Sequence, residues 1–166
     1  IPFEGLTGRL FDIIGLRLTN TLPGERINTI QAGDIKISAS ICYEIAFSEL
    51  IRKTAAASNL IITISNDTWF GSSYGPIQHL EIAQNRALEH KKAILRSTNS
   101  GISAFISNNG KILKKQGYFE DKMLKTEVNL YEGKTFYAKY GNLPLYLILS
   151  VILIIILILK KKKKIY

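Results

Sequence analysis

The sequence contains a single cysteine, Cys42, followed by Tyr43 and Glu44. A strand-like run precedes it and a helix-like pattern follows, so we expect Cys42 at a sharp turn at the carboxyl end of a strand. Helix N-terminal amides and the helix dipole would favour the thiolate there, and the thiolate is the nucleophilic form. The alternative is a small packed residue, because free cysteines are often buried. Position alone makes Cys42 a candidate nucleophile.

Two polar stretches also follow predicted strands. Asn66 and Trp69 lie in a loop after the apolar run 60–64, and Arg96 opens a polar stretch between two later strands. Ligands of α/β proteins bind at the carboxyl ends of strands, so we expect these loops beside Cys42. Each could equally be an ordinary polar turn.

Metal and phosphate chemistry find no support in the sequence. The two histidines, His79 and His90, do not recur with Cys or carboxylates at the spacing of a metal site. The glycine-containing stretch 71–75 lacks the lysine of a phosphate-binding loop. We therefore expect no metal and no cofactor, and we expect His79 to be a hydrogen-bonded residue at the start of a helix.

Alternating strand and helix patterns predict an α/β fold that positions these residues. Apolar residues alternate with polar ones over 35–41, and Pro76 suits the first turn of a helix. Asn108-Asn109-Gly110 is typical of a hairpin turn. The predicted strands are 35–41, 60–64, 93–96, 102–107, 111–116 and 122–130, and the predicted helices are 44–57 and 76–92.

The composition and charge of the chain restrict the class of molecule that it is expected to bind. The chain has 166 residues, is 46% hydrophobic and carries a net charge of +9. The consecutive lysines Lys160 to Lys164 supply more than half of that charge, so the charge forms a local tail. A nucleic-acid-binding face would spread its basic residues, and we expect no nucleic acid partner. One cysteine allows no internal disulfide.

The stretch from Leu143 to Leu159 contains no charged residue. A membrane-spanning helix needs about 20 apolar residues, with about 17 as the lower limit. Tyr140 and Tyr146 suit a membrane interface, and the lysine tail is expected on the cytoplasmic side. This pattern predicts a transmembrane helix with the preceding residues on the outer face. A buried core helix or strand with a basic tail is the alternative.

Together, these motifs resemble a known enzyme family. The stretches are CYE at 42–44, SNDTWFG at 65–71, GPIQH at 75–79, RALE at 86–89, LRSTNSGISA at 95–104 and YAKYGNLPL at 137–145. In this order, followed by an apolar helix, they resemble the apolipoprotein N-acyltransferases of the nitrilase (carbon–nitrogen hydrolase) superfamily. The resemblance covers residues 1 to about 159.

The resemblance implies an α-β-β-α sandwich, of which this chain is the C-terminal part, followed by one transmembrane helix. The implied divisions are 1–139 for the catalytic domain, 140–159 for the helix and 160–166 for a basic cytoplasmic tail. The protein would lie in the bacterial inner membrane, multi-pass in its full length, with a periplasmic catalytic domain. Its partners would be the lipid bilayer, a phospholipid that donates an acyl chain and a diacylglyceryl apolipoprotein that accepts it.

The family uses a Glu-Lys-Cys triad, and Cys42 matches its cysteine. Tyr43 and Glu44 match positions that shape the site, and the Tyr43 amide is a candidate oxyanion donor. Trp69 matches a loop at the substrate entrance, whereas Asn66 and Arg96 are expected to organise the site.

The triad's glutamate and lysine are expected before residue 1. The pair Ile1-Pro2 fits the apolar-Pro pair that follows the family's Gly-Glu-Tyr, so Glu4 is not expected to be the loop glutamate. The chain alone is then expected to be inactive. A nitrilase-type amidase and a non-catalytic membrane-anchored fragment are the alternative functions.

Overall fold

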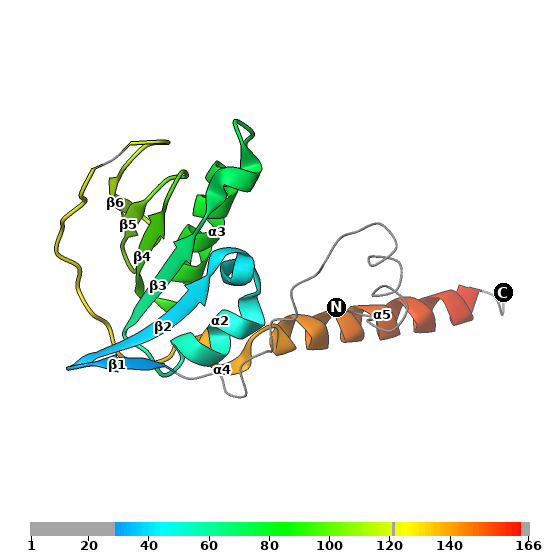
Figure 1. Ribbon diagram of the computed structural model, residues 1–166. Helices are drawn as coiled ribbons and strands as arrows, with labels where there is room; N and C mark the ends of the chain where they lie inside the picture. The colour runs from blue at the N-terminus through cyan, green and yellow to red at the C-terminus, as the bar shows by residue number, and fades with distance from the viewer. Residues whose placement is uncertain (1–28, 121, 164–166) are drawn as a thin grey trace, which may run out of the picture.

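The computed structural model describes residues 29–120 and 122–163, so the stretch around Ile1-Pro2 lies outside the described residues. A mixed sheet of six strands forms the body, in the order β1-β2-β3-β4-β5-β6 (Figure 1). The central strands β2, β3 and β4 run parallel, and the outer pairings are antiparallel. The strands are β1 (Ile30–Ala32), β2 (Ile35–Ile41), β3 (Leu60–Ser65), β4 (Ala93–Thr98), β5 (Ala104–Ile106) and β6 (Ile112–Lys115).

Helices connect the parallel strands and cover one face of the sheet (Figure 1). The 3-10 helix η1 (Cys42–Ala46) and α2 (Ser48–Ala55) join β2 to β3, and η2 (Asp67–Phe70) and α3 (Gly75–His90) join β3 to β4. Pro76 lies in the first turn of α3, where its missing N–H leaves no helical bond unmade. The α/β fold predicted from the sequence is confirmed.

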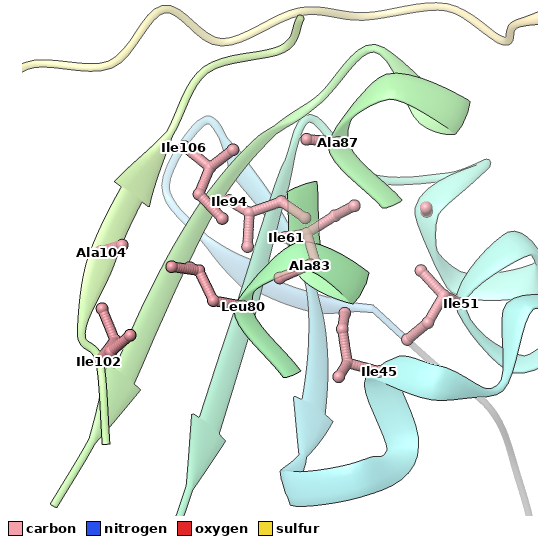
Figure 2. Packing of buried hydrophobic residues seen from close by; sticks show 11 residues of the cluster. Ile45, Ile51, Ile61, Leu80, Ala83, Ala87, Ile94, Ile102, Ala104 and Ile106 are labelled. Atoms are coloured by element: carbon pink, nitrogen blue, oxygen red, sulfur yellow. The ribbon is translucent and has the colours of Figure 1, made fainter. Parts of the chain in front are cut away.

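The core lies between this helical layer and the sheet (Figure 2). Ile51 of α2 and Leu80 of α3 pack with Ile61 of β3 and Ile94 of β4 in one buried cluster. Ile45 of η1 belongs to the same cluster and is completely buried. Burial of Ile45 therefore fixes the turn that carries Cys42 against the body of the protein.

The other face of the central strands is apolar and partly exposed. Ala39 and Ile41 of β2 pair with Ile62 and Ile64 of β3 on this face. Ile41 remains 64% exposed and Ile64 52% exposed. Apolar side chains across adjacent strands are expected to pack against a further layer, because their exposure to water is unfavourable.

Two of the predicted elements differ in the structure. The segment 122–130 forms no strand, because its residues pair with no neighbouring strand; β propensity depends on such pairing. The buried Lys92 instead holds the chain beyond it, since its Nζ donates to the carbonyls of Tyr131 and Gly133. The helix predicted over 44–57 is split at Phe47, whose extended backbone separates η1 from α2.

The short helix α4 (Phe136–Tyr140) joins this body to the long helix α5 (Leu143–Lys163). Thr135 caps α4, and its hydroxyl also donates to the Glu89 carbonyl at 2.6 Å. Arg52 of α2 donates to the Ala138 carbonyl at 3.2 Å. The span Leu143–Lys161 of α5 is long and apolar enough to cross a membrane, and none of it is buried against the described protein.

Candidate active site

Cys42 lies at the carboxyl end of β2, where the strand meets η1. Its φ is +53°, a left-handed conformation that residues other than glycine rarely adopt. Such a conformation costs on the order of 1–3 kcal/mol and persists only where the surroundings enforce it. The side chain is a partly exposed free thiol. The sharp strand-to-helix turn predicted at this position is present.

The helix beside Cys42 is shorter than predicted. Because η1 ends at Ala46, the Cys42 side chain stands beside a few amides rather than at the end of a long helix dipole. Glu44 is exposed and its carboxylate accepts a hydrogen bond from the Ile41 N–H at 2.7 Å. In this structure Glu44 thus stabilises the turn that carries Cys42.

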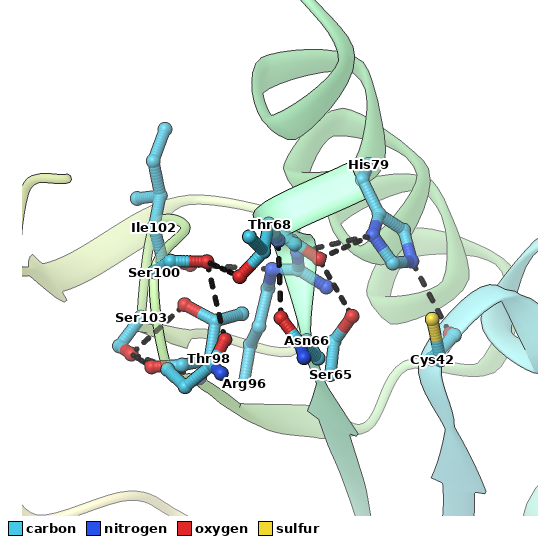
Figure 3. Close-up of polar contacts among 12 residues, drawn as sticks. Cys42, Ser65, Asn66, Thr68, His79, Arg96, Thr98, Ser100, Ile102 and Ser103 are labelled. Atoms are coloured by element: carbon cyan, nitrogen blue, oxygen red, sulfur yellow. Dashed lines mark hydrogen bonds and ion pairs between the residues drawn. The ribbon is translucent and has the colours of Figure 1, made fainter. Parts of the chain in front are cut away.

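The carboxyl ends of β3 and β4 lie at the same edge of the sheet, because both strands run parallel to β2. Asn66 follows β3 and caps η2 by accepting from the Thr68 N–H at 3.1 Å. The Thr68 hydroxyl lies 2.9 Å from that of Ser100, in the loop after β4. The three segments singled out in the sequence therefore meet at one edge (Figure 3).

Trp69 of η2 is 91% exposed. It contributes no packing to the described body, which distinguishes it from its neighbour Phe70, whose ring lies 5.9 Å from that of His79. Tyr43 on η1 and Phe47, which follows η1, are also exposed, with ring centroids 6.1 Å apart. Exposed aromatic side chains thus occur on both turns at the carboxyl ends of β2 and β3.

A buried ion pair lies behind this edge. Arg96 of β4 donates through Nη2 to Asp67 Oδ2 at 2.6 Å, and neither side chain has exposed surface. The Asp67 carboxylate also accepts from the Ser65 hydroxyl at 2.6 Å, and Arg96 Nε donates to the Ile102 carbonyl at 3.2 Å. Burial lowers the pKa of Arg96, while the Asp67 carboxylate opposes that shift. Arg96 thus holds together the loops after β3 and β4, through Asp67 on one side and Ile102 on the other.

His79 connects this ion pair to Cys42. Its Nδ1 lies 3.2 Å from Asp67 Oδ1 and 3.2 Å from Arg96 Nη2, and its Nε2 lies 3.2 Å from the Cys42 carbonyl oxygen (Figure 3). Burial and the Arg96 charge lower the pKa of His79, although Asp67 opposes this shift. From the sequence, His79 is expected to be a hydrogen-bonded residue at the start of a helix, and Asp67 is not singled out within the loop that follows 60–64. A signal was available, since both lie within the motifs SNDTWFG and GPIQH.

Gly101 explains how the loop after β4 approaches this cluster. A Cβ atom at position 101 would overlap the Asp67 carboxylate.

Within the described residues, no group of three or more His, Cys, Asp or Glu side chains could hold a metal ion. The arrangement offers a partly exposed thiol at the start of η1, where helix N-terminal amides lie, and this combination suits nucleophilic attack on a carbonyl carbon.

Sequence comparisons identify relatives of the chain. The sequence profile of the carbon–nitrogen hydrolase family matches residues 9–136. Apolipoprotein N-acyltransferases of Photobacterium profundum and Wigglesworthia glossinidia brevipalpis are 40% and 41% identical over 148 and 154 residues. These alignments cover 88% and 92% of this chain but only 29% and 31% of the relatives. The chain therefore spans about a third of the length of the curated relatives it matches.

Solved structures agree with the fold. Nit3, a Saccharomyces cerevisiae member of branch 10 of the nitrilase superfamily, aligns with a TM-score of 0.54 and 25% identity. The alignment covers 60% of this chain and 40% of that one. A carbon–nitrogen hydrolase of Helicobacter pylori aligns with a TM-score of 0.55 and 14% identity, over 61% of this chain and 43% of that one. The described sheet and its helical layer therefore have the nitrilase fold.

Proposed function

The chain belongs to the carbon–nitrogen hydrolase family, and from this premise we propose that it is part of an apolipoprotein N-acyltransferase. The observation that carries the proposal is the run of relatives with this name, which are 36–41% identical over about nine-tenths of the chain. The full-length enzyme would transfer an acyl chain from a membrane phospholipid to the N-terminal amine of a diacylglyceryl apolipoprotein.

Cys42 is the nucleophile in this proposal. Its thiolate attacks the carbonyl carbon of the phospholipid ester, and the C–O bond breaks to leave a thioester on Cys42. The leaving alkoxide takes up the proton that the thiol lost, through the catalytic base, and departs as a lysophospholipid. The amine of the acceptor then attacks the thioester carbonyl, the C–S bond breaks, and Cys42 recovers a proton as the amide forms. Two easier steps thus replace one direct transfer.

The chain's own residues support the first step. Negative charge develops on the ester oxygen, and the amide of Tyr43, at the start of η1, is a suitable donor to it because the first amides of a helix lack intrahelical partners. The exposed aromatic rings of Tyr43 and Trp69 suit contact with an acyl chain. The triad's glutamate and lysine are assigned, by the resemblance, to the part of the protein that precedes this chain.

Membrane attachment supports a phospholipid donor. We propose that α5 spans the bilayer, with Tyr140 and Tyr146 at the outer interface and the lysine tail on the cytoplasmic side. The catalytic domain would then lie on the periplasmic side of the inner membrane. Because α4 and Thr135 tie α5 to the body, the site would remain close to its lipid substrate.

The apolar face of the sheet supports the proposal that this chain is one half of a sandwich. The family's α-β-β-α architecture requires a second sheet, and the exposed Ile41 and Ile64 lie on the face where that sheet would pack. The alternatives are a nitrilase-type amidase and a non-catalytic membrane-anchored fragment. An amidase of soluble substrates has no need of α5, which makes the acyltransferase the preferred function.

The experiment uses the full-length protein in detergent micelles with a phospholipid labelled in its acyl chain. Cys42→Ala and Cys42→Ser should abolish the covalent acyl adduct, whereas Met123→Ala, at a position that is 93% exposed, should leave it unchanged. Retention of the labelled adduct in Cys42→Ala would show that another residue is the nucleophile. An adduct that fails to pass to a diacylglyceryl peptide amine, but is released by water, would instead favour the amidase.

A further inference from the structure

The two ring nitrogens of His79 face different partners, and this fixes the position of its proton. The Cys42 carbonyl oxygen, 3.2 Å from Nε2, can only accept a hydrogen bond. Nε2 must therefore carry a hydrogen. In a neutral imidazole the other nitrogen, Nδ1, is then an acceptor.

Arg96 supplies the donor that Nδ1 needs. Its Nη2 lies 3.2 Å from Nδ1, whereas the Asp67 carboxylate oxygen at a similar distance has no hydrogen to give. The same Nη2 donates to the other oxygen of Asp67. Asp67 thus orients Arg96, and Arg96 selects the His79 tautomer whose hydrogen points at Cys42.

His79 acts on the backbone of Cys42 and not on its sulfur. The described contact of Nε2 is with the carbonyl oxygen, and only 1% of the His79 surface is exposed, so the ring does not touch substrate. The burial that shields the ring and the adjacent Arg96 charge both disfavour its protonated form. This geometry therefore does not support a role for His79 as the general base that takes the proton from the Cys42 thiol.

We propose that His79 is a positioning residue, which holds Cys42 in its left-handed conformation by donating from Nε2 to the Cys42 carbonyl. The proposal rests on the function proposed above, in which Cys42 is the nucleophile. The φ of +53° needs enforcement from its surroundings, and the described contacts provide it on both sides. Glu44 binds the amide of the preceding residue, Ile41, and His79 binds the carbonyl of Cys42 itself.

Three substitutions at position 79 of the full-length protein test this role. His79→Gln keeps an amide N–H near the position of Nε2 and a carbonyl that can accept from Arg96. His79→Asn has the same groups but is shorter, so it can reach Arg96 and Asp67 and not Cys42. His79→Met is close to Gln in shape and has no donor.

The first measurement is the single-turnover rate of acyl transfer from labelled phospholipid to Cys42. A misplaced nucleophile can lower a rate by about 100-fold, so we expect losses of roughly 10- to 100-fold for Asn and Met. The Gln variant should stay within about 5-fold of the wild type, and the lipid concentration for half-maximal rate should change little in all three. Equal losses in the Gln and Asn variants, with both folded by near-UV circular dichroism, would overturn the proposal, as would Asn or Met within about 2-fold of the wild type.

The second measurement is alkylation of Cys42 by iodoacetamide, followed by mass spectrometry of the peptide that contains it. This readout needs no lipid, so it separates the present proposal from the proposed function. We expect the alkylation rate to change in the Asn and Met variants and to be restored in the Gln variant. If that pattern holds while the wild-type protein forms no acyl adduct, the positioning role stands and the acyltransferase function fails. An alkylation rate that is the same in all four proteins contradicts the positioning role.

Discussion

The buried ion pair between Asp67 and Arg96 makes a sharp prediction for stability. Asp67→Asn keeps the shape of the side chain but removes its charge, which leaves the Arg96 guanidinium uncompensated in a site with no exposed surface. Breaking a buried pair in this way costs about 3–5 kcal/mol. The amide oxygen of Asn can still accept from Ser65 or Arg96, so we expect the lower end, about 3 kcal/mol.

Thermal unfolding of the full-length protein in detergent, followed by near-UV circular dichroism, measures this loss. At about 2–4 °C per kcal/mol for a domain of 150–250 residues, the expected decrease in Tm is roughly 6–12 °C. Glu120→Gln is the matched control, because Glu120 pairs with Lys122 at 3.0 Å but both side chains are largely exposed. Exposed pairs contribute about 0–1 kcal/mol, so the control should change Tm by no more than about 4 °C.

The double variant Asp67→Asn/Arg96→Met tests whether the uncompensated Arg96 charge causes the loss of stability in Asp67→Asn. With the guanidinium removed as well, no uncompensated charge remains, and part of the stability should return relative to Asp67→Asn. The reasoning is refuted if Asp67→Asn lowers Tm no more than the exposed control does. It is also refuted if removing Arg96 from the Asp67→Asn protein lowers Tm further.

Three further predictions concern other positions. Gly101→Ala should displace Asp67, because the new Cβ would overlap its carboxylate, and should lower both Tm and the rate of acyl transfer. Trp69→Ala should leave Tm within about 2 °C of the wild type, since the side chain is 91% exposed, but should slow acyl transfer from long-chain phospholipids more than from short-chain ones. Burial and nearby cationic groups lower the pKa of His90 to about 4, so the unfolded chain binds the additional proton between about pH 6.5 and 4. Stability should therefore fall as the pH drops through that range, and urea unfolding of His90→Phe should show a weaker pH dependence; an unchanged dependence contradicts this role for His90.

The turn at Cys42 could be predicted because its signals are local. An alternating run ends at Ile41, and a helical pattern follows, so the junction falls at Cys42. The positive φ could not be predicted, because Cys has no preference for that conformation and one of the contacts at the turn comes from a distant part of the chain. The Cys42 carbonyl contacts a residue 37 positions away.

The ion pair illustrates the same limit. Asp67 and Arg96 are 29 residues apart, and each had a plausible local role as a turn residue. Their contact follows from the parallel pairing of β3 with β4, which brings the ends of both strands to one edge. The strand predicted over 122–130 was wrong because the local sequence pattern was suitable but no neighbouring strand pairs with it. A strand pattern alone does not produce a strand without such a partner. The three-residue β1 and the five-residue α4 were missed, since such short elements lack a recognisable period.

The position of His79 in the sequence now has a physical explanation. It lies in the first turns of α3, which begins beyond the loop that carries Asp67, and α3 crosses over the sheet to reach β4 and Arg96. The His79 ring therefore contacts one residue from each of the three parallel strands or the turn that follows it. These contacts are the Cys42 carbonyl after β2, the Asp67 carboxylate after β3 and the Arg96 guanidinium on β4. A change in the packing of any one strand would alter the hydrogen bond to Cys42. In the proposed positioning role, His79 acts on the reaction through the backbone of Cys42 and has no access to substrate itself.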